Sequence, residues 1–100
     1  MKRNEASKIL VIDDADNVAT TLVDFPAGAD VVFTRLGEPS TIVLIDDIPS
    51  GHKFAIDVIS SGDAVKKYGV VIARAMVAIK PGEHVHVHNI ESNRGRGDRS

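Results

Sequence analysis

The chain has 100 residues, a formal net charge of −2, four histidines and no cysteine. This length fits one small domain, and the weak negative charge argues against a nucleic-acid or membrane-surface partner. Without cysteine there can be neither a disulfide framework nor a thiolate metal site. No apolar run approaches the ~20 residues that a membrane span needs, and the N-terminus has no signal-peptide pattern. We therefore expect a cytoplasmic protein with no membrane partner.

Short β-branched runs separated by turn residues follow one another along the chain. Residues 8–12 are predicted to form a strand, and so are residues 18–24, where a helix remains the alternative. Further strands are predicted at 31–33, 41–45, 53–59 and 70–79, with a helical turn near 64–67. Together these runs predict an all-β domain of about seven short strands over residues 1–91. Residues 92–100 are expected to form a flexible C-terminal tail.

A turn pattern recurs four times between these runs: an apolar residue, two further residues and then a glycine. The glycine suits a tight turn with a positive φ, and the apolar residue suits burial beside it. The copies are unevenly spaced, so they indicate short strands joined by glycine turns and not a solenoid. They lie at residues 25–28, 48–51, 59–62 and 79–82.

Three of the four histidines alternate with valines at residues 84–88. In an extended strand the histidines would line one face and the valines would be buried on the other. Neighbouring histidines would then lie ~7 Å apart, which disfavours a single ion bound by all three. Two of them suit a metal site completed by another element, such as His52. The alternative is that they are solvated or bonded to neighbours.

Two lysine-bearing segments suit contact with an anion. His52 and Lys53 follow the glycine of the second turn, where backbone and side chains can approach a ligand closely. Lys66 and Tyr68 offer an ammonium group and a hydroxyl group to a carboxylate. For both segments, a solvated surface position remains the alternative.

Several segments, in one order, resemble the SAF-type N-terminal domain of the altronate and galactarate dehydratase family. The most specific are Gly-His-Lys at 51–53 and His-Val-His-Asn at 86–89, which are correctly spaced. Further matching segments lie at 16–19, 26–28, 66–69 and 72–75. The resemblance covers residues 8–91, and the same domain occurs as a separate small subunit, as in the alpha subunit of sulfolactate sulfo-lyase.

This resemblance implies a β-clip fold and the small subunit of a hydroxy-acid lyase. Such an enzyme removes water from a sugar acid such as altronate or galactarate, or sulfite from sulfolactate. The family resembles iron-dependent dehydratases, so Fe²⁺ is expected in the assembled enzyme. The implied partners are a large dehydratase or lyase subunit and a small hydroxy-acid substrate.

The resemblance also implies roles for individual residues at a site shared with the large subunit. The expected residues are catalytic His52, His86 and His88, substrate-binding Lys53, Lys66 and Asn89, and metal-binding His84 and His86. Lys53 is expected to contact a carboxylate, and histidine suits either the acid or the base of an elimination.

Two other functions remain open. SAF-type domains also occur as binding modules, and in that case the chain would bind a small anion or a protein partner without catalysis. The third hypothesis is a purely structural role in a homo-oligomer. It predicts that replacing the histidines leaves the activity of an assembled enzyme unchanged.

Overall fold

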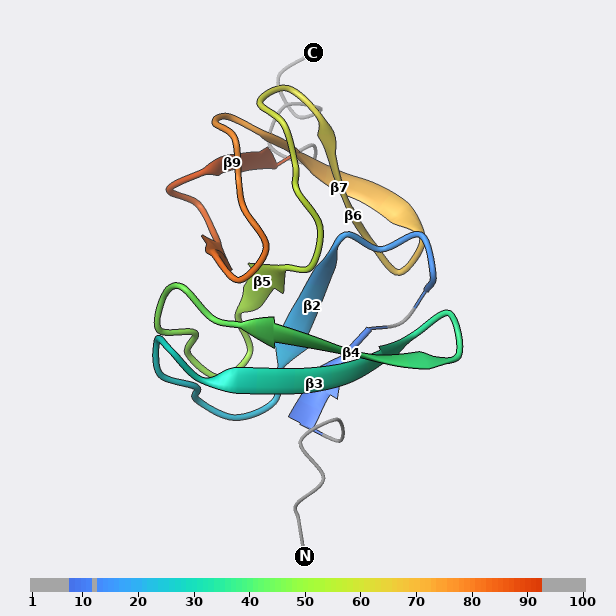
Figure 1. The fold of residues 1–100 in the computed structure, drawn as a ribbon. Coiled ribbons are helices and arrows are strands. Elements are labelled where there is room, and N and C mark those ends of the chain that lie inside the picture. The colour runs from blue at the N-terminus through green and yellow to red at the C-terminus, as the bar shows by residue number, and fades with distance from the viewer. Residues whose placement is uncertain (1–7, 12, 93–100) are drawn as a thin grey trace, which may run out of the picture.

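The computed structural model describes residues 8–11 and 13–92, which form nine strands and no α-helix (Figure 1). The strands are β1 (Ile9–Leu10), β2 (Val18–Thr21), β3 (Asp30–Arg35), β4 (Glu38–Val43), β5 (Lys53–Ala55), β6 (Ala64–Lys67), β7 (Val70–Ala75), β8 (His84–Val85) and β9 (Ile90–Ser92). The all-β prediction is confirmed. The predicted tail lies outside the described residues except for Ser92, which ends β9. Within the described ranges we find no candidate for a membrane-spanning helix.

Strands from distant parts of the chain meet in a four-stranded antiparallel sheet with the order β1-β2-β5-β8. Its register places Thr20 opposite Lys53, and Lys53 opposite Val85. The next row along the strands places Phe54 opposite His84. Directly opposed residues in an antiparallel sheet share a face, whereas successive residues alternate. These two rows therefore point to opposite faces of the sheet.

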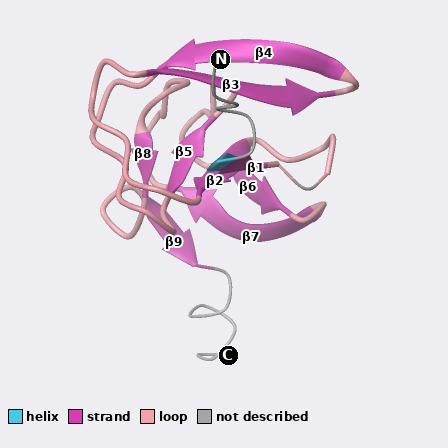
Figure 2. Cartoon of the chain, turned by 90° about the horizontal axis from the view of Figure 1, so that it is seen from below, coloured by secondary structure: helices cyan, strands magenta, loops and turns pink. Residues whose placement is uncertain are grey.

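Two separate hydrophobic cores cover the two faces of this sheet. Phe54 belongs to the first core, together with Val31 and Phe33 of β3. Val85 belongs to the second core, together with Val65 of β6 and residues of β7. Figure 2 shows the β3–β4 hairpin on one side of the central strands and β7 and β9 on the other. Side chains in the row of Phe54 thus point toward one core, and those in the row of Val85 point toward the other.

The predicted glycine turns organise the rest of the chain. The positive φ is confirmed at all four turn glycines, namely Gly28, Gly51, Gly62 and Gly82. The apolar residues that begin the turns are buried. They form two antiparallel β-bridges, Phe25 with Ile48 and Ile59 with Ile79. Each pair exchanges two backbone hydrogen bonds of 2.8–2.9 Å. One pair of turns brackets the β3–β4 hairpin and the other brackets the β6–β7 hairpin, so the two halves of the domain repeat one arrangement.

Gly82 occupies the most crowded of these turns. A Cβ atom at this position would lie 2.5 Å from the carbonyl oxygen of Val43. The amide of Gly82 donates to the carbonyl of Ala55 at 2.8 Å, and its own carbonyl accepts from the amide of Ile45 at 2.9 Å. The turn is therefore clamped between β5 and the end of β4, which fixes where β8 begins.

Several element predictions are wrong in detail. Residues 64–67 form β6, paired with β7, and not a helical turn. Residues 18–21 form a strand, so the helical alternative for 18–24 is also wrong. β5 ends at Ala55 and β7 at Ala75, since the chain leaves each strand for the next bracketing turn, and the predictions 53–59 and 70–79 were too long. β6 was missed because Ala-Val-Lys-Lys has no alternating pattern, and pairing with β7 holds it extended.

Candidate functional site

The histidine segment is a strand for only two residues. β8 ends at Val85, the chain bends at His86, and residues 87–89 form a turn. The prediction of one extended strand through residue 88 is therefore wrong. Val85 is fully buried as predicted, but Val87 is 76% exposed because it lies in the turn.

The side chain of Asn89 stabilises this turn through hydrogen bonds to the backbone. Its Oδ1 atom accepts a hydrogen bond of 3.0 Å from the amide of His86, and its Nδ2 atom donates one of 2.8 Å to the carbonyl of His84. The amide of Asn89 also donates to the carbonyl of His86 at 3.0 Å. Asn89 is buried, so these bonds form away from water. The structure thus gives Asn89 a positioning role, and its predicted contact with substrate stays a prediction.

His52 reaches the same place from the turn before β5. It lies two residues before Phe54, which is opposite His84, so His52 and His84 share a face of the sheet. The Nδ1 atom of His52 is 2.9 Å from the Nε2 atom of His84. The rings of His52 and His86 stack with centroids 4.3 Å apart and planes 21° apart. We call His52, His84 and His86 the histidine cluster.

The histidine cluster fits a divalent metal ion. Each of the three residues offers one ring nitrogen, and these atoms lie within 4.8 Å of one another. Imidazole nitrogens bind zinc-like ions at about 2.0–2.1 Å, so two nitrogens on one ion are at most about 4.2 Å apart. The 2.9 Å pair meets this limit, and the third nitrogen lies within 4.8 Å of the other two. Metal binding itself stays a prediction.

His88 lies beside the cluster but outside it. Its ring centroid is 5.3 Å from that of His84, with the planes tilted by 33°. Its side chain is exposed, in contrast to the partly buried rings of the cluster. The turn after β8 therefore separates His88 from the other histidines. Its predicted catalytic role remains open to test.

The surroundings of His84 and His86 favour the neutral forms of these two rings. Partial burial lowers the pKa of His84, and the charged forms of His52, His88 and His86 lower it further, while Asp46 acts in the opposite direction. The carboxylate of Asp46 accepts a hydrogen bond of 3.0 Å from the amide of His84. Partial burial and the neighbouring positive charges also lower the pKa of His86. Neutral imidazoles have the lone pairs that a metal ligand or a general base requires.

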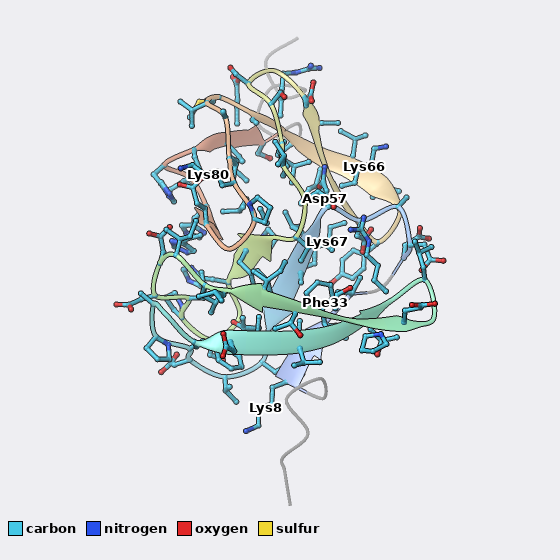
Figure 3. All side chains as sticks on the ribbon, in the orientation of Figure 1. Lys8, Phe33, Asp57, Lys66, Lys67 and Lys80 are labelled. Carbon is cyan, nitrogen blue, oxygen red and sulfur yellow. The ribbon has the colours of Figure 1, made fainter. Side chains whose placement is uncertain are left out.

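The predicted substrate-binding lysines lie in other places. Lys53 is opposite Val85 and not in the row of Phe54, so its side chain leaves the sheet on the face away from His52 and His84. Burial lowers the pKa of Lys53, and the charge of Lys67 lowers it further. Lys66 is on β6, and both its backbone groups bond to Asn17. Figure 3 shows Lys67 over β2 and Lys66 over β7.

Three residues of this region were not predicted from the sequence. Lys67 is the lysine whose charge reaches Lys53, and its position follows from the β6–β7 pairing. Asp46 holds the start of β8, although it is far from His84 in the chain. Thr20 lies beside Lys53 only because β2 pairs with β5. None of the three carries a local sequence signal, since each depends on strand pairing.

Residues 7–93 match the model of a protein family described as the altronate/galactarate dehydratase SAF domain. The chain belongs to this family. The resemblance of the 51–53 and 86–89 segments is thereby confirmed, and both segments meet at the histidine cluster of the SAF domain.

Two groups of relatives share this SAF domain. The altronate dehydratase of Escherichia coli (strain K12) is 41% identical over 78 residues, and that of Bacillus subtilis (strain 168) is 38% identical over 82 residues. The match covers 78% of this chain but only 15% of the Escherichia coli protein. The (2R)-sulfolactate sulfo-lyase subunit alpha of Chromohalobacter salexigens is 49% identical over 88 residues, which are 84% of this chain and 94% of that subunit. The SAF domain thus spans a small part of one relative and nearly all of another.

Proposed function

We propose that this chain is the small subunit of a hydroxy-acid lyase, and that its histidine cluster completes an active site shared with a large subunit. The substrate class is a sugar acid such as altronate or galactarate, or sulfolactate. The supporting observation is the meeting of His52 with His84 and His86, in a chain that matches 94% of a sulfo-lyase subunit alpha. The proposal places the assembled enzyme in the cytoplasm, in carbohydrate-acid metabolism.

Elimination beside a carboxylate breaks two bonds, the C–H bond at the α-carbon and the bond to the leaving group on the neighbouring carbon. The α-proton is taken by a base, and the hydroxyl or sulfite on the neighbouring carbon departs with its electron pair. His88 suits the proton transfer, because it is exposed beside the cluster and is not one of the three converging residues. Histidine is the side chain best suited to this role near neutral pH.

The three cluster residues have a different task in this proposal. His52, His84 and His86 would hold a divalent iron ion, which supplies Lewis-acid polarisation of the substrate when bound. The Asn89 bonds fix the backbone at His84 and His86, and one ring nitrogen of each of the three residues lies within 4.8 Å of the others. The large subunit would contribute the remaining walls of the site.

The test is reconstitution with the large subunit. The isolated chain should have no lyase activity, and the pair should release either the keto acid or sulfite. We expect His52→Ala and His88→Ala to lower kcat by about 10²-fold or more, whereas Glu38→Gln on the exposed tip of the β3–β4 hairpin should keep wild-type kcat.

Two further measurements make the result decisive. Size-exclusion chromatography of each variant mixture separates loss of chemistry from loss of assembly. Full activity of the large subunit without this chain would contradict the proposal. Wild-type kcat in both histidine variants would instead leave the chain a structural subunit.

A further inference from the structure

Thr20 and Lys53 form an unusual polar pair inside the domain. They lie directly opposite each other on β2 and β5, so their side chains share the face of the central sheet that lies away from His52. Thr20 is only 8% exposed, and its Oγ1 atom is buried with no hydrogen-bond partner among the described residues. A buried hydroxyl without a partner costs free energy, and native structures have few of them.

The β6–β7 hairpin brings a second cation to this pair. The amide of Gly69 at the hairpin tip donates to the carboxylate of Asp16 at 2.8 Å, which anchors the tip beside the start of β2. The Nζ atom of Lys67 lies 4.7 Å from the centroid of the Tyr68 ring, and the charge of Lys67 acts on Lys53. Lys67, which Figure 3 shows over β2, thus adds a second positive charge to the one on Lys53, the residue opposite Thr20.

These cations have no counter-ion among the residues that the structure describes. Neither ammonium group forms an ion pair or a hydrogen bond in the part of the chain that the structure describes. The buried carboxylate of Asp16 accepts from the amides of Asp13 and Gly69. Like charges repel, and burial of an unpaired charge is unfavourable, so this arrangement is stable at a cost that a bound anion would relieve.

We propose that Thr20, Lys53 and Lys67 form a binding site for a small oxyanion, a carboxylate or a sulfonate. The two ammonium groups supply charge, and the Thr20 hydroxyl donates a hydrogen bond to one oxygen. The site is separate from the histidine cluster, which lies on the other face of the sheet.

The site can be tested on the whole chain without a large subunit or metal. We would titrate the ¹⁵N-labelled, EDTA-treated chain with sodium acetate and with sodium methanesulfonate, using sodium chloride at the same ionic strength as the reference. We expect saturable amide shifts centred on Thr20 and Lys53 with at least one of the two anions. The acetate and methanesulfonate arms decide between a carboxylate and a sulfonate as the preferred group.

Variants give the decisive comparison. Lys53→Met removes a charged hydrogen-bond partner and should weaken anion binding about tenfold. Thr20→Val removes the hydroxyl and should weaken anion binding about threefold to fivefold. Lys80→Met is the matched control, because Lys80 is exposed and lies apart from Lys66 and Lys67 in Figure 3. Thr20→Val should also stabilise the chain, since it removes an unsatisfied buried oxygen, so weaker binding cannot come from unfolding.

Two results would overturn the site. One is that acetate and methanesulfonate shift the spectrum no more than chloride does. The other is that Lys53→Met and Thr20→Val bind as tightly as Lys80→Met. Neither result bears on the proposed lyase subunit, because activity in the reconstituted enzyme is measured separately.

Discussion

The Nδ1 atom of His52 lies 2.9 Å from the Nε2 atom of His84, although 32 positions separate the two residues in the chain. At this distance the two nitrogens either share one proton in a hydrogen bond or point their lone pairs at a common ion. The stacked ring of His86 adds a third nitrogen to the same space. The histidine cluster therefore depends on how the turn before β5 meets β8 and the bend that follows it.

The histidine cluster should bind a divalent metal in the isolated chain. Co²⁺ serves as the probe, followed by calorimetry and by its visible spectrum. We expect His52→Ala and His84→Ala to weaken binding by about tenfold or more, since even an indirect partner of a ligand is worth that much. His88→Ala is the control and should bind Co²⁺ almost as the wild type does. Equal losses in all three variants would rule out the three-residue site.

Asn89 should stabilise the turn and, through it, the metal site. Asn89→Ala leaves the amide of His86 and the carbonyl of His84 without their partner, so we expect a loss of about 1–3 kcal/mol in the free energy of unfolding. Asn17 makes two similar backbone bonds, to Ala64 and Lys66. Asn17→Ala should therefore cost a similar amount in urea titrations and leave Co²⁺ affinity unchanged. Co²⁺ affinity that is unchanged in both variants would contradict the positioning role of Asn89.

Alanine substitutions at Gly82 and Gly62 distinguish two destabilising effects. One is the strain of a positive φ, and the other is a steric clash of the new Cβ atom. Both glycines have a positive φ, +91° and +89°, but a Cβ atom at Gly62 has no neighbour within 4 Å. Gly62→Ala should lower the free energy of unfolding by about 1–2 kcal/mol. Gly82→Ala should lose about 1–3 kcal/mol more, because its Cβ would meet the carbonyl of Val43. Thermal or urea unfolding measures both, and equal losses would show that β4 does not clamp this turn.

The metal-free chain should lose stability in mild acid. The pKa values of His84 and His86 lie below the ordinary value of 6.5, so the unfolded chain takes up protons that the folded chain resists. The contribution is fully present above about pH 6.5 and is lost as the pH falls toward the lowered values. Urea titrations in EDTA should show a lower free energy of unfolding at about pH 5 than at about pH 7.5. The slope should be smaller in His84→Gln, and an unchanged slope would exclude His84 as a cause.

Local patterns predicted the local features of the fold. An apolar residue followed at the third position by glycine identified all four turns, because a positive φ is a property of the glycine itself. The lengths of the strands were predicted less well. β5 and β8 end after three and two residues, where a turn paired with a distant segment takes over. β-branched composition alone does not mark such an end.

The sequence by itself determined the family, the all-β class and the glycine turns, and it supplied the candidate site residues. Only the tertiary structure decided which of these candidates lie together. It placed His52 beside His84, directed Lys53 to the opposite face with Thr20, and paired β6 with β7 so that the charge of Lys67 lowers the pKa of Lys53. The physical reason is that alternation along a strand is a local property, whereas register between strands is set by packing the two cores and the paired turns.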